Sequence, residues 1–392
     1  MRPTVKLWKI ATVSAWNSAP QDEKLFKNWK YPFYRTADVW KVHYSRNLTE
    51  VKDYLNEEWI KWLKLYKKWT ILFPKSWAST FLNHRVIMWQ DWYVVSHLAT
   101  ISVNEDVDEN FVYYYLTTVD AKDLCADQWY PSLKSTNIAE IEIPLPMLET
   151  QKSIVAKLDN IFTELDQTKS EIQKNLDNTD EFWKSALNQA FQGDWEMKKL
   201  GEIWSLTRWK WFLKSDFVEN WFPCIHYGQI HMKFDTAIDK NITYISEELA
   251  KKSWIAEKND IIIAITSEDV EWSCKSVAWL WNYPVAVGAH AAIYKHTQNP
   301  LFVSYYLQTS MFFNQKINYT HWSKVVEIKP IDVWNCVIPV PPFSEQERIV
   351  EHLNQVSKEV KEIKFQYQSQ IDNLEELKKS VLYKTFRWEL GE

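Results

Sequence analysis

Histidines are the residues of this chain whose types and spacing come nearest to supporting chemistry, and their pattern favours a structural role. His97 and His290 stand in similar surroundings, Ser-His-Leu-Ala and Ala-His-Ala-Ala. An equivalent pair in two parts of one chain predicts a histidine satisfied inside the fold rather than a single active centre. The sequence has no P-loop and no GxGxxG, HExxH, GxSxG or Asn-Pro-Pro-aromatic motif. We therefore expect a binding protein without catalytic residues, not an enzyme.

The cysteines do not form a metal-binding or disulfide pattern. Cys125, Cys224, Cys274 and Cys336 are scattered, with no CxxC spacing. We expect them to be small buried apolar residues in a reducing compartment, with no metal site. The start of the chain lacks the apolar core of a signal peptide, and the longest apolar run, residues 261–265, is too short to cross a bilayer. These features predict a cytoplasmic protein with no membrane contact.

The sequence contains an internal repeat, so the structural elements around these residues are expected to occur twice. The tetrapeptide Ile-Pro-Leu-Pro at 143–146 recurs as Ile-Pro-Val-Pro at 338–341, 195 positions later. The same spacing aligns Phe191 with Phe386, so one register holds over more than forty residues. Elsewhere the two halves match more loosely, with small insertions between them. An internal repeat of this length indicates two copies of one structural unit.

Tryptophan occurs where glycine is expected. The chain has 24 tryptophans but only 5 glycines, whereas glycine normally makes up about 7% of residues. In the repeat alignment Trp8 faces Gly201 and Trp388 faces Gly193. Tight turns often need a positive φ, which glycine supplies and tryptophan resists. We infer that the source reads UGA as glycine and that many of these tryptophans stand for glycine.

A heptad-like apolar stripe follows each Pro-rich boundary. Apolar residues recur at spacings of three and four over some forty residues in both copies. Two matched stripes in one chain favour two long helices that pack on each other as an antiparallel coiled coil. The expected helix–helix seam consists of Ile154, Leu158, Ile161, Leu165, Ile172 and Leu176 in the first copy and Ile349, Leu353, Val356, Val360, Ile363 and Ile371 in the second.

The remaining sequence predicts two mixed α/β domains. Short apolar runs at 70–73, 260–265 and 337–340 predict strands, and the aromatic stretches at 108–118 and 300–314 predict helices with core-facing aromatics. The fold class is therefore α/β (α+β), with the two duplicated domains separated by the long helices. The predicted parts are domain 1 at 1–148, a central helix at 149–195, domain 2 at 196–343 and a C-terminal helix at 344–392.

The boundary motifs resemble those of one protein family. Ile-Pro-Val-Pro-Pro-Phe-Ser-Glu-Gln-Glu-Arg-Ile-Val at 338–350, Pro-Ser-Leu-Lys-Ser at 131–135 and Trp-Glu-Met-Lys-Lys-Leu-Gly-Glu-Ile at 195–203 resemble the specificity subunit of type I restriction-modification enzymes. The resemblance covers the whole chain, including the duplication. The departure is tryptophan at positions where the family has glycine, such as Trp8, which recoding would remove.

The resemblance implies a catalytically silent subunit that recognises double-stranded DNA. Each domain would read one half of a split target, and the helices would hold the domains apart and dock two methyltransferase subunits. Those partners would bind S-adenosylmethionine and methylate adenine N6, and motor-nuclease subunits would use ATP and Mg²⁺ to cleave unmodified DNA. No cofactor is expected in this chain. The formal net charge of −5 does not by itself argue for nucleic acid.

Under this resemblance, base edges would be read by polar side chains in turns that flank strands. The candidates are Arg35, Thr36, Lys75, Ser76, Asn83, His84 and Arg85 in the first half and Arg208, Lys210, Lys214, His226, Tyr227, Gln229, Thr266, Ser267 and Lys275 in the second.

Two other functions remain open at this point. The chain could be a duplicated coiled-coil scaffold that binds only proteins, without DNA readout. It could also be the recognition subunit of a fused restriction-methylation enzyme, with one fused partner in place of two.

Overall fold

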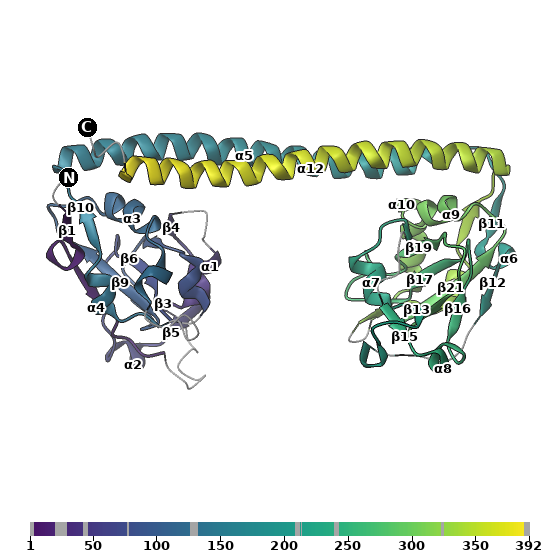
Figure 1. Ribbon diagram of the computed structural model, residues 1–392, viewed down its shortest axis with the longest axis horizontal. Coiled ribbons are helices and arrows are strands. Elements are labelled where there is room, and N and C mark those ends of the chain that lie inside the picture. Colours follow the sequence, from purple (N-terminus) through teal and green to yellow (C-terminus); the bar gives the residue numbers. More distant parts are fainter. Residues whose placement is uncertain are drawn as a thin grey trace. The chain divides into compact units, whose positions relative to one another are not determined.

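The computed structural model divides the chain into two compact units (Figure 1). The first unit contains residues 1–172 and 369–392, and the second contains residues 173–368. The structure describes residues 4–19, 30–41, 46–76, 78–125, 132–207, 212, 214–238, 243–322 and 325–387.

The first unit is built on a five-stranded sheet. In spatial order its strands are β2 (Ala11–Ser14), β9 (Leu98–Val103), β6 (Ile71–Pro74), β7 (Val86–Met88) and β4 (Asn47–Leu48). A three-stranded sheet contains β5 (Asp53–Leu55), β3 (Tyr31–Tyr34) and β8 (Tyr93–Val94), and a ribbon pairs β1 (Thr4–Lys6) with β10 (Glu142–Pro144). The short helices are η1 (Leu7–Lys9), α1 (Thr36–Lys41), α2 (Glu57–Ile60), η3 (Ala78–Leu82), α3 (Glu109–Thr117), η4 (Ala121–Leu124) and α4 (Ser135–Ala139).

The second unit repeats this topology. Its five-stranded sheet has the order β12 (Trp204–Thr207), β21 (Ala291–His296), β17 (Ile261–Ala264), β19 (Ser276–Trp279) and β14 (Ala237–Ile238). A four-stranded sheet contains β15 (Thr243–Ile245), β13 (Phe222–Ile225), β20 (Val285–Val287) and β16 (Trp254–Ala256). A three-stranded sheet contains β18 (Thr266–Ser267), β23 (Val326–Glu327) and β22 (His321–Trp322). A ribbon pairs β11 (Met197–Lys199) with β24 (Val337–Pro339). The short helices are α6 (Leu200–Ile203), η5 (Lys214–Asp216), α7 (Tyr227–Met232), α8 (Glu247–Ala250), α9 (Pro300–Tyr306), α10 (Ser310–Lys316), η6 (Ile317–Tyr319) and α11 (Pro330–Val333).

Two long helices begin close to the expected boundaries. Helix α5 runs over Leu148–Ala190 and α12 over Phe343–Arg387, and each unit contains a segment of both. Each domain therefore forms one compact unit with parts of both long helices. Among the described residues, none of the helices combines the length and apolar character needed to cross a bilayer.

Most seam positions are buried within their own units. In the first unit Leu158 is 1% exposed, and in the second unit Leu353 is fully buried. Ile161 and Ile363 depart from the expectation, because they are 39% and 41% exposed. Leu158 and Leu353 belong to the hydrophobic cores that include their domains. Their burial therefore does not test a seam between the two helices, which stays a prediction.

The aromatic helices of the two domains are core elements, as expected. Phe111 in α3 and Phe302 in α9 are fully buried. The expected single helix at 300–314 is wrong: α9 ends at Tyr306 and α10 starts at Ser310. The break occurs at Thr309, whose hydroxyl accepts a hydrogen bond from the backbone N–H of Phe312 at 3.2 Å and so begins a new helix.

The expectation of buried cysteines is largely confirmed. Cys224, Cys274 and Cys336 are buried, and Cys125 is half-buried. Among the described residues, none of the four forms a disulfide. Burial raises the pKa of both Cys274 and Cys336 to about 12, so these two thiols stay protonated and behave as apolar side chains.

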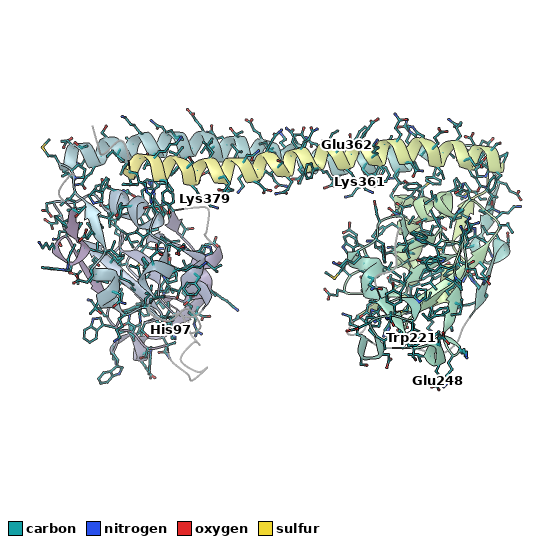
Figure 2. The ribbon with its side chains drawn as sticks, in the orientation of Figure 1. His97, Trp221, Glu248, Lys361, Glu362 and Lys379 are labelled. Atoms are coloured by element: carbon teal, nitrogen blue, oxygen red, sulfur yellow. The ribbon has the colours of Figure 1, made fainter. Side chains whose placement is uncertain are left out.

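Two tryptophans occupy backbone conformations that suit glycine. Trp69 has φ 69° and Trp221 has φ 125°, in the left-handed region that a bulky side chain rarely adopts. Trp221 is also 70% exposed (Figure 2). By contrast, Trp279 is fully buried and donates its Nε1–H to the carbonyl oxygen of Tyr283 at 2.8 Å. We propose that Trp69 and Trp221 stand for recoded glycines and that Trp279 is a genuine tryptophan.

The first prediction concerns these positions. Trp221→Gly should stabilise the chain by about 1 kcal/mol, because it removes the cost of a positive φ. Trp279→Gly should destabilise it by about 3 kcal/mol or more, because it empties a packed site. Chemical denaturation of the full chain measures both changes. The control is Trp272→Gly, at an exposed position whose φ is not positive, where no gain is expected. A loss of stability at Trp221 would contradict the proposal.

Candidate nucleic-acid interface

Equivalent side chains hold the start of one helix in each domain. In the first unit the Asp38 carboxylate accepts hydrogen bonds from the backbone N–H groups of Arg35 at 2.9 Å and Lys52 at 3.2 Å. In the second unit the Gln229 side chain accepts from the backbone N–H of His226 at 2.9 Å and donates to the hydroxyl of Thr243 at 3.0 Å. The acceptor lies three residues after the helix start in both cases. This bond fixes the backbone of Arg35 and His226. The His226 ring takes part in the same helix start, because it is only 6% exposed and its Nδ1 accepts a hydrogen bond from the backbone N–H of Gly228 at 3.2 Å.

Ring contacts gather several second-half candidates around Tyr227. Its ring centroid lies 4.5 Å from that of His226 and 5.2 Å from that of His290. His231 lies further away, at 6.1 Å. Strand β18 joins this group, because His231 Nε2 lies 3.0 Å from the carbonyl oxygen of Thr266. The start of α7 and the strand end after β17 therefore form one aromatic and polar surface.

Lysines flank this surface. Lys275 donates from Nζ to the carbonyl oxygen of His231 at 3.0 Å, and burial lowers the pKa of its ammonium group. Lys214 is exposed at the start of η5. Burial lowers the pKa of His226, and the charges of Lys214 and His290 lower it further. His226 therefore favours the neutral imidazole, which can both donate and accept a hydrogen bond.

The first-half candidates divide into accessible and interior groups. Arg35 and Thr36 are half-buried at the start of α1, where Arg35 Nε lies 2.5 Å from a carboxylate oxygen of Asp53. Lys75 and Ser76 are half-buried after β6.

The candidates next to η3 and β7 lie deeper in the domain. The Asn83 side chain is committed to Asp120 and to the backbone N–H of Ala121. His84 and Arg85 are only 7% and 3% exposed. Their burial favours a structural or pocket role over contact with a base edge.

Of the remaining second-half candidates, two are buried and two lie outside the described residues. Thr266 and Ser267 are buried, at 7% and 9% exposure. Arg208 and Lys210 lie outside the described residues, so they stay predictions.

The expectation of two interior histidines is wrong. His97 (Figure 2) and His290 are both exposed. Their equivalence comes from the backbone: the carbonyl oxygen of His97 accepts from the N–H of Lys75 at 3.1 Å, and that of His290 accepts from the N–H of Ile265 at 2.9 Å. The side chains are thereby presented beside the strand ends. The repeated histidine motif correctly marked equivalent positions in the two domains. The apolar residues beside each histidine wrongly predicted that its side chain is buried.

His231 was missed by sequence reasoning. It sits four residues after Tyr227 on α7, one helical turn away, and this spacing was the available signal. Among the described residues, no group of three histidine, cysteine or acidic side chains is arranged to hold a metal ion. The surface thus offers hydrogen-bonding and stacking groups.

Comparison with known proteins identifies the class. The family described as "Type I restriction modification DNA specificity domain" matches residues 4–178 and 192–373, which include both domains. A protein built from two such domains is a DNA-recognition component. The chain belongs to this family of type I restriction-modification specificity proteins.

Individual relatives agree with this assignment. The chain is 23% identical over 301 residues to the type I restriction enzyme MjaVIII specificity subunit of Methanocaldococcus jannaschii, covering 69% of this chain and 68% of that protein. It is 25% identical over 332 residues to the EcoBI specificity subunit of Escherichia coli, covering 75% and 68%.

Solved structures show the same fold. A chain in the structure described as "Structural basis underlying complex assembly and conformational transition of the type I R-M system" has a TM-score of 0.73 and 17% identity, covering 99% of this chain and 98% of that chain. The crystal structure of the HsdS subunit from Thermoanaerobacter tengcongensis has a TM-score of 0.52 and 17% identity, covering 99% and 97%.

The second prediction tests the electrostatics around His226. Lys214→Ala should raise the pKa of His226, because it removes a nearby positive charge. Since folding lowers this pKa, protonation opposes folding, and the wild-type chain should lose stability as the pH falls below about 6.5. NMR titration of the His226 ring measures the first effect. Lys251→Ala, at an exposed lysine of the same unit, is the control and should leave the pKa unchanged. An unchanged pKa in the Lys214 variant would disprove the assignment.

Proposed function

We propose that each domain reads one half of a bipartite DNA target for a type I restriction-modification complex. The supporting observation is the pair of equivalent helix starts, which have the same backbone frame but different side chains. Arg35 and Thr36 occupy this place in the first unit, and His226 and Tyr227 occupy it in the second. Equivalent frames with different side chains suit two recognition surfaces of different sequence preference.

The chemistry of the two surfaces fits base readout. An arginine can bond bidentately to guanine, and histidine, threonine and tyrosine can exchange hydrogen bonds with base edges. Arg35 gives the first surface a guanidinium group, whereas the second has the ring of Tyr227 with the buried, neutral ring of His226 beside it. The two surfaces therefore should prefer different bases.

The long helices are proposed to pair antiparallel and to separate the domains. Within the first unit, Lys169 pairs with Glu375 at 2.5 Å and Asp166 pairs with Lys378 at 3.0 Å. The numbering falls along α12 as it rises along α5, so the two segments run in opposite directions. In the second unit, Lys364 of α12 pairs with Asp180 of α5.

The helices are also the proposed docking elements for partners. Two methyltransferase subunits that carry S-adenosylmethionine would bind there, and motor-nuclease subunits that use ATP and Mg²⁺ would complete the complex. With a net charge of −5, the chain depends on these partners for much of the phosphate contact. The catalytic chemistry would belong to the partners and take place in the cytoplasm.

The third prediction tests the assignment of domains to half-sequences. Arg35→Ala should relax discrimination in one half-sequence, by about 1–3 kcal/mol if the side chain makes a good bidentate contact. His226→Ala should relax discrimination in the other half only. Methylation of a library of bipartite sites by the reconstituted complex measures both. Lys251→Ala is the control for general weakening. Relaxation of both halves by one substitution would rule out the assignment, and DNA binding unchanged by either would favour a protein scaffold.

The fourth prediction treats the helices as a ruler. Four residues inserted after Asn175 in α5 and four after Ser369 in α12 add about 6 Å of helix at 1.5 Å per residue. Because B-DNA advances 3.4 Å per base pair, the preferred spacer should lengthen by about one or two base pairs. The half-sequences should stay the same, since neither helix start in the domains is altered. Methylation of sites with varied spacers measures this change.

A matched control distinguishes the length of the helices from disruption of their pairing. Replacing four residues at each position, without insertion, should leave the spacer unchanged. Full activity at the original spacer after both insertions would show that the helices do not set the distance. Altered half-sequences would show that the helices take part in base reading.

A further inference from the structure

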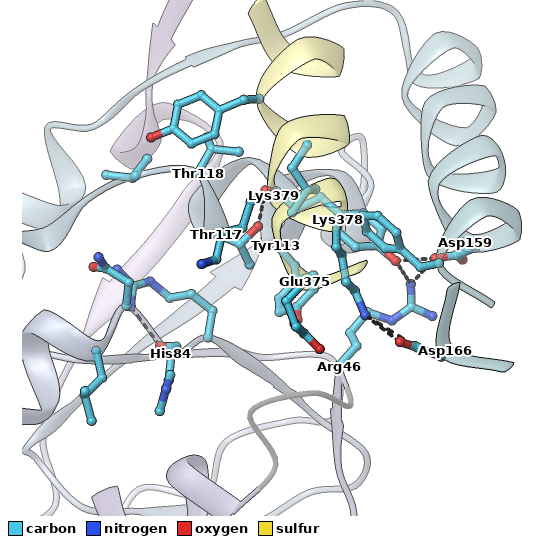
Figure 3. Close-up of a pocket in the computed structure, with 18 of the residues that line it drawn as sticks. Arg46, His84, Tyr113, Thr117, Thr118, Asp159, Asp166, Glu375, Lys378 and Lys379 are labelled. Atoms are coloured by element: carbon cyan, nitrogen blue, oxygen red, sulfur yellow. Dashed lines mark hydrogen bonds and ion pairs between the residues drawn. The ribbon is translucent and has the colours of Figure 1, made fainter. Parts of the chain in front are cut away.

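A cavity lies in the first unit where the domain meets its segments of the two long helices (Figure 3). Its volume is about 610 Å³, which is within the range of small-molecule sites. Arg85 and Tyr113 line it from the domain, Asp159 and Phe162 from α5, and Lys378 from α12. None of the described residues that line the cavity is a tryptophan.

Tyr113 contributes an unused hydroxyl to this cavity. Tyr113 is only 9% exposed. Among the described residues, its hydroxyl has no hydrogen-bond partner. Burial raises the pKa of Tyr113 to about 12, although the charges of Arg46 and Arg85 oppose this shift. The hydroxyl is therefore a protonated donor that lies within the field of two arginines.

Arg85 is a buried cation without a carboxylate in ion-pair contact among the described residues. It is 3% exposed, and its Nη1 donates to the carbonyl oxygen of His84 at 2.8 Å. Its guanidinium carbon lies 3.3 Å from the ring centroid of Phe73, and Nε and Nη2 have no hydrogen-bond partner in the described structure. Burial lowers the pKa of Arg85 to about 9, with Asp120 and Tyr113 opposing the shift, so it stays charged at neutral pH.

The other charged groups of the lining are compensated by partners. Arg46 donates to Asp159 at 2.6 Å, and Lys378 donates to Asp166 at 3.0 Å. The remaining acids and lysine have partners too: Glu375 accepts from Lys169, Asp120 from Asn83 and the backbone of Lys122, and Glu376 from Lys379. Arg85 thus leaves one positive charge uncompensated by a direct contact. Buried charges in proteins are normally paired, so the charge of Arg85 favours an anion at this place.

We propose that this cavity binds a small organic anion with one carboxylate or phosphate group. The acidic group accepts a hydrogen bond from the Tyr113 hydroxyl and offsets the charge of Arg85, with Arg46 adding to the positive field. The apolar part of the ligand packs against Phe162, Leu382 and Tyr383. The bound molecule contacts the domain, α5 and α12 of the first unit together, so it braces the domain on its helices. This site is additional to the proposed DNA interface and does not depend on it.

The second unit does not repeat this chemistry. Ser304 stands where the first unit has Tyr113, and its hydroxyl is committed to the carbonyl oxygen of Thr236 at 2.7 Å. Lys275 precedes β19 as Arg85 precedes β7, and it donates to the carbonyl oxygen of His231. The proposed ligand is therefore specific to the first domain.

The test measures binding of simple anions to the full-length chain. Phenyl phosphate and benzoate should raise the unfolding temperature and bind with measurable affinity by calorimetry, whereas uncharged benzamide should not. Tyr113→Phe should weaken binding of both anions about tenfold or more, because it removes a hydrogen bond to a charged group. Tyr115→Phe is the matched control: it removes a hydroxyl from the same helix, but that hydroxyl donates to the carbonyl oxygen of Glu142. It should leave binding unchanged.

Arg85→Met separates a binding role from a structural one. If the charge is kept for a ligand, this variant loses anion binding but is more stable than the wild type without ligand, because an unpaired buried charge has been removed. Equal binding of the anions and benzamide, or unchanged binding in both Tyr113→Phe and Arg85→Met, would overturn the proposal. If Arg85→Met does not fold, the comparison of anion binding between Tyr113→Phe and Tyr115→Phe tests the proposal by itself.

Discussion

Each domain is attached to the long helices by one short aromatic helix, and the rest of the domain depends on that contact. In the first unit, Phe111 of α3 packs with its ring centroid 5.4 Å from that of Phe386 in α12. In the second unit, the ring centroid of Phe302 in α9 lies 5.1 Å from that of Phe191, the residue directly after α5. Each domain therefore uses the beginning of one long helix and the end of the other. In each unit the start of one long helix therefore lies beside the end of the other. This arrangement requires the two helix segments to run in opposite directions within each unit.

A buried amide reinforces each attachment. Gln151 accepts a hydrogen bond from the backbone N–H of Asp108, and Gln346 accepts from that of Asn299, both at 2.9 Å. In both units the contacted residue is the N-cap of the aromatic helix. The glutamine therefore fixes the place where α3 or α9 begins relative to its long helix. This is a physical reason for the glutamine that follows each Pro-rich boundary in the sequence.

The repeated parts of the fold could be predicted from the sequence because they rest on local patterns. The Pro-rich boundaries, the long helices and the buried aromatic stretches all produce periodic or recurring signals. The exposure of the His290 side chain could not be predicted, because it depends on the backbone conformation. His290 has a positive φ of 62°, although the residues around it are apolar. The cavity was equally hidden: Arg46, Tyr113 and Lys378 come from distant segments, and no spacing in the sequence links them.

The two attachments also show how the halves diverged without losing the fold. In the first unit the Tyr114 hydroxyl donates to Asp159 at 2.5 Å, and Arg46 pairs with the same carboxylate. In the second unit the Tyr305 hydroxyl donates to Asn354 at 2.7 Å, at the position equivalent to Asp159.

A neutral amide thus replaces a carboxylate while the tyrosine keeps its geometry. Once the carboxylate is present, an arginine beside it becomes favourable, and that arginine contributes to the positive field of the cavity. The charge of the cavity in the first unit therefore depends in part on one repeated position, whose counterpart, the uncharged Asn354, lines a cavity in the second unit. The same logic applies at the helix starts, where Asp38 and Gln229 keep one backbone frame while the side chains beside them, half-buried Arg35 and buried His226, differ.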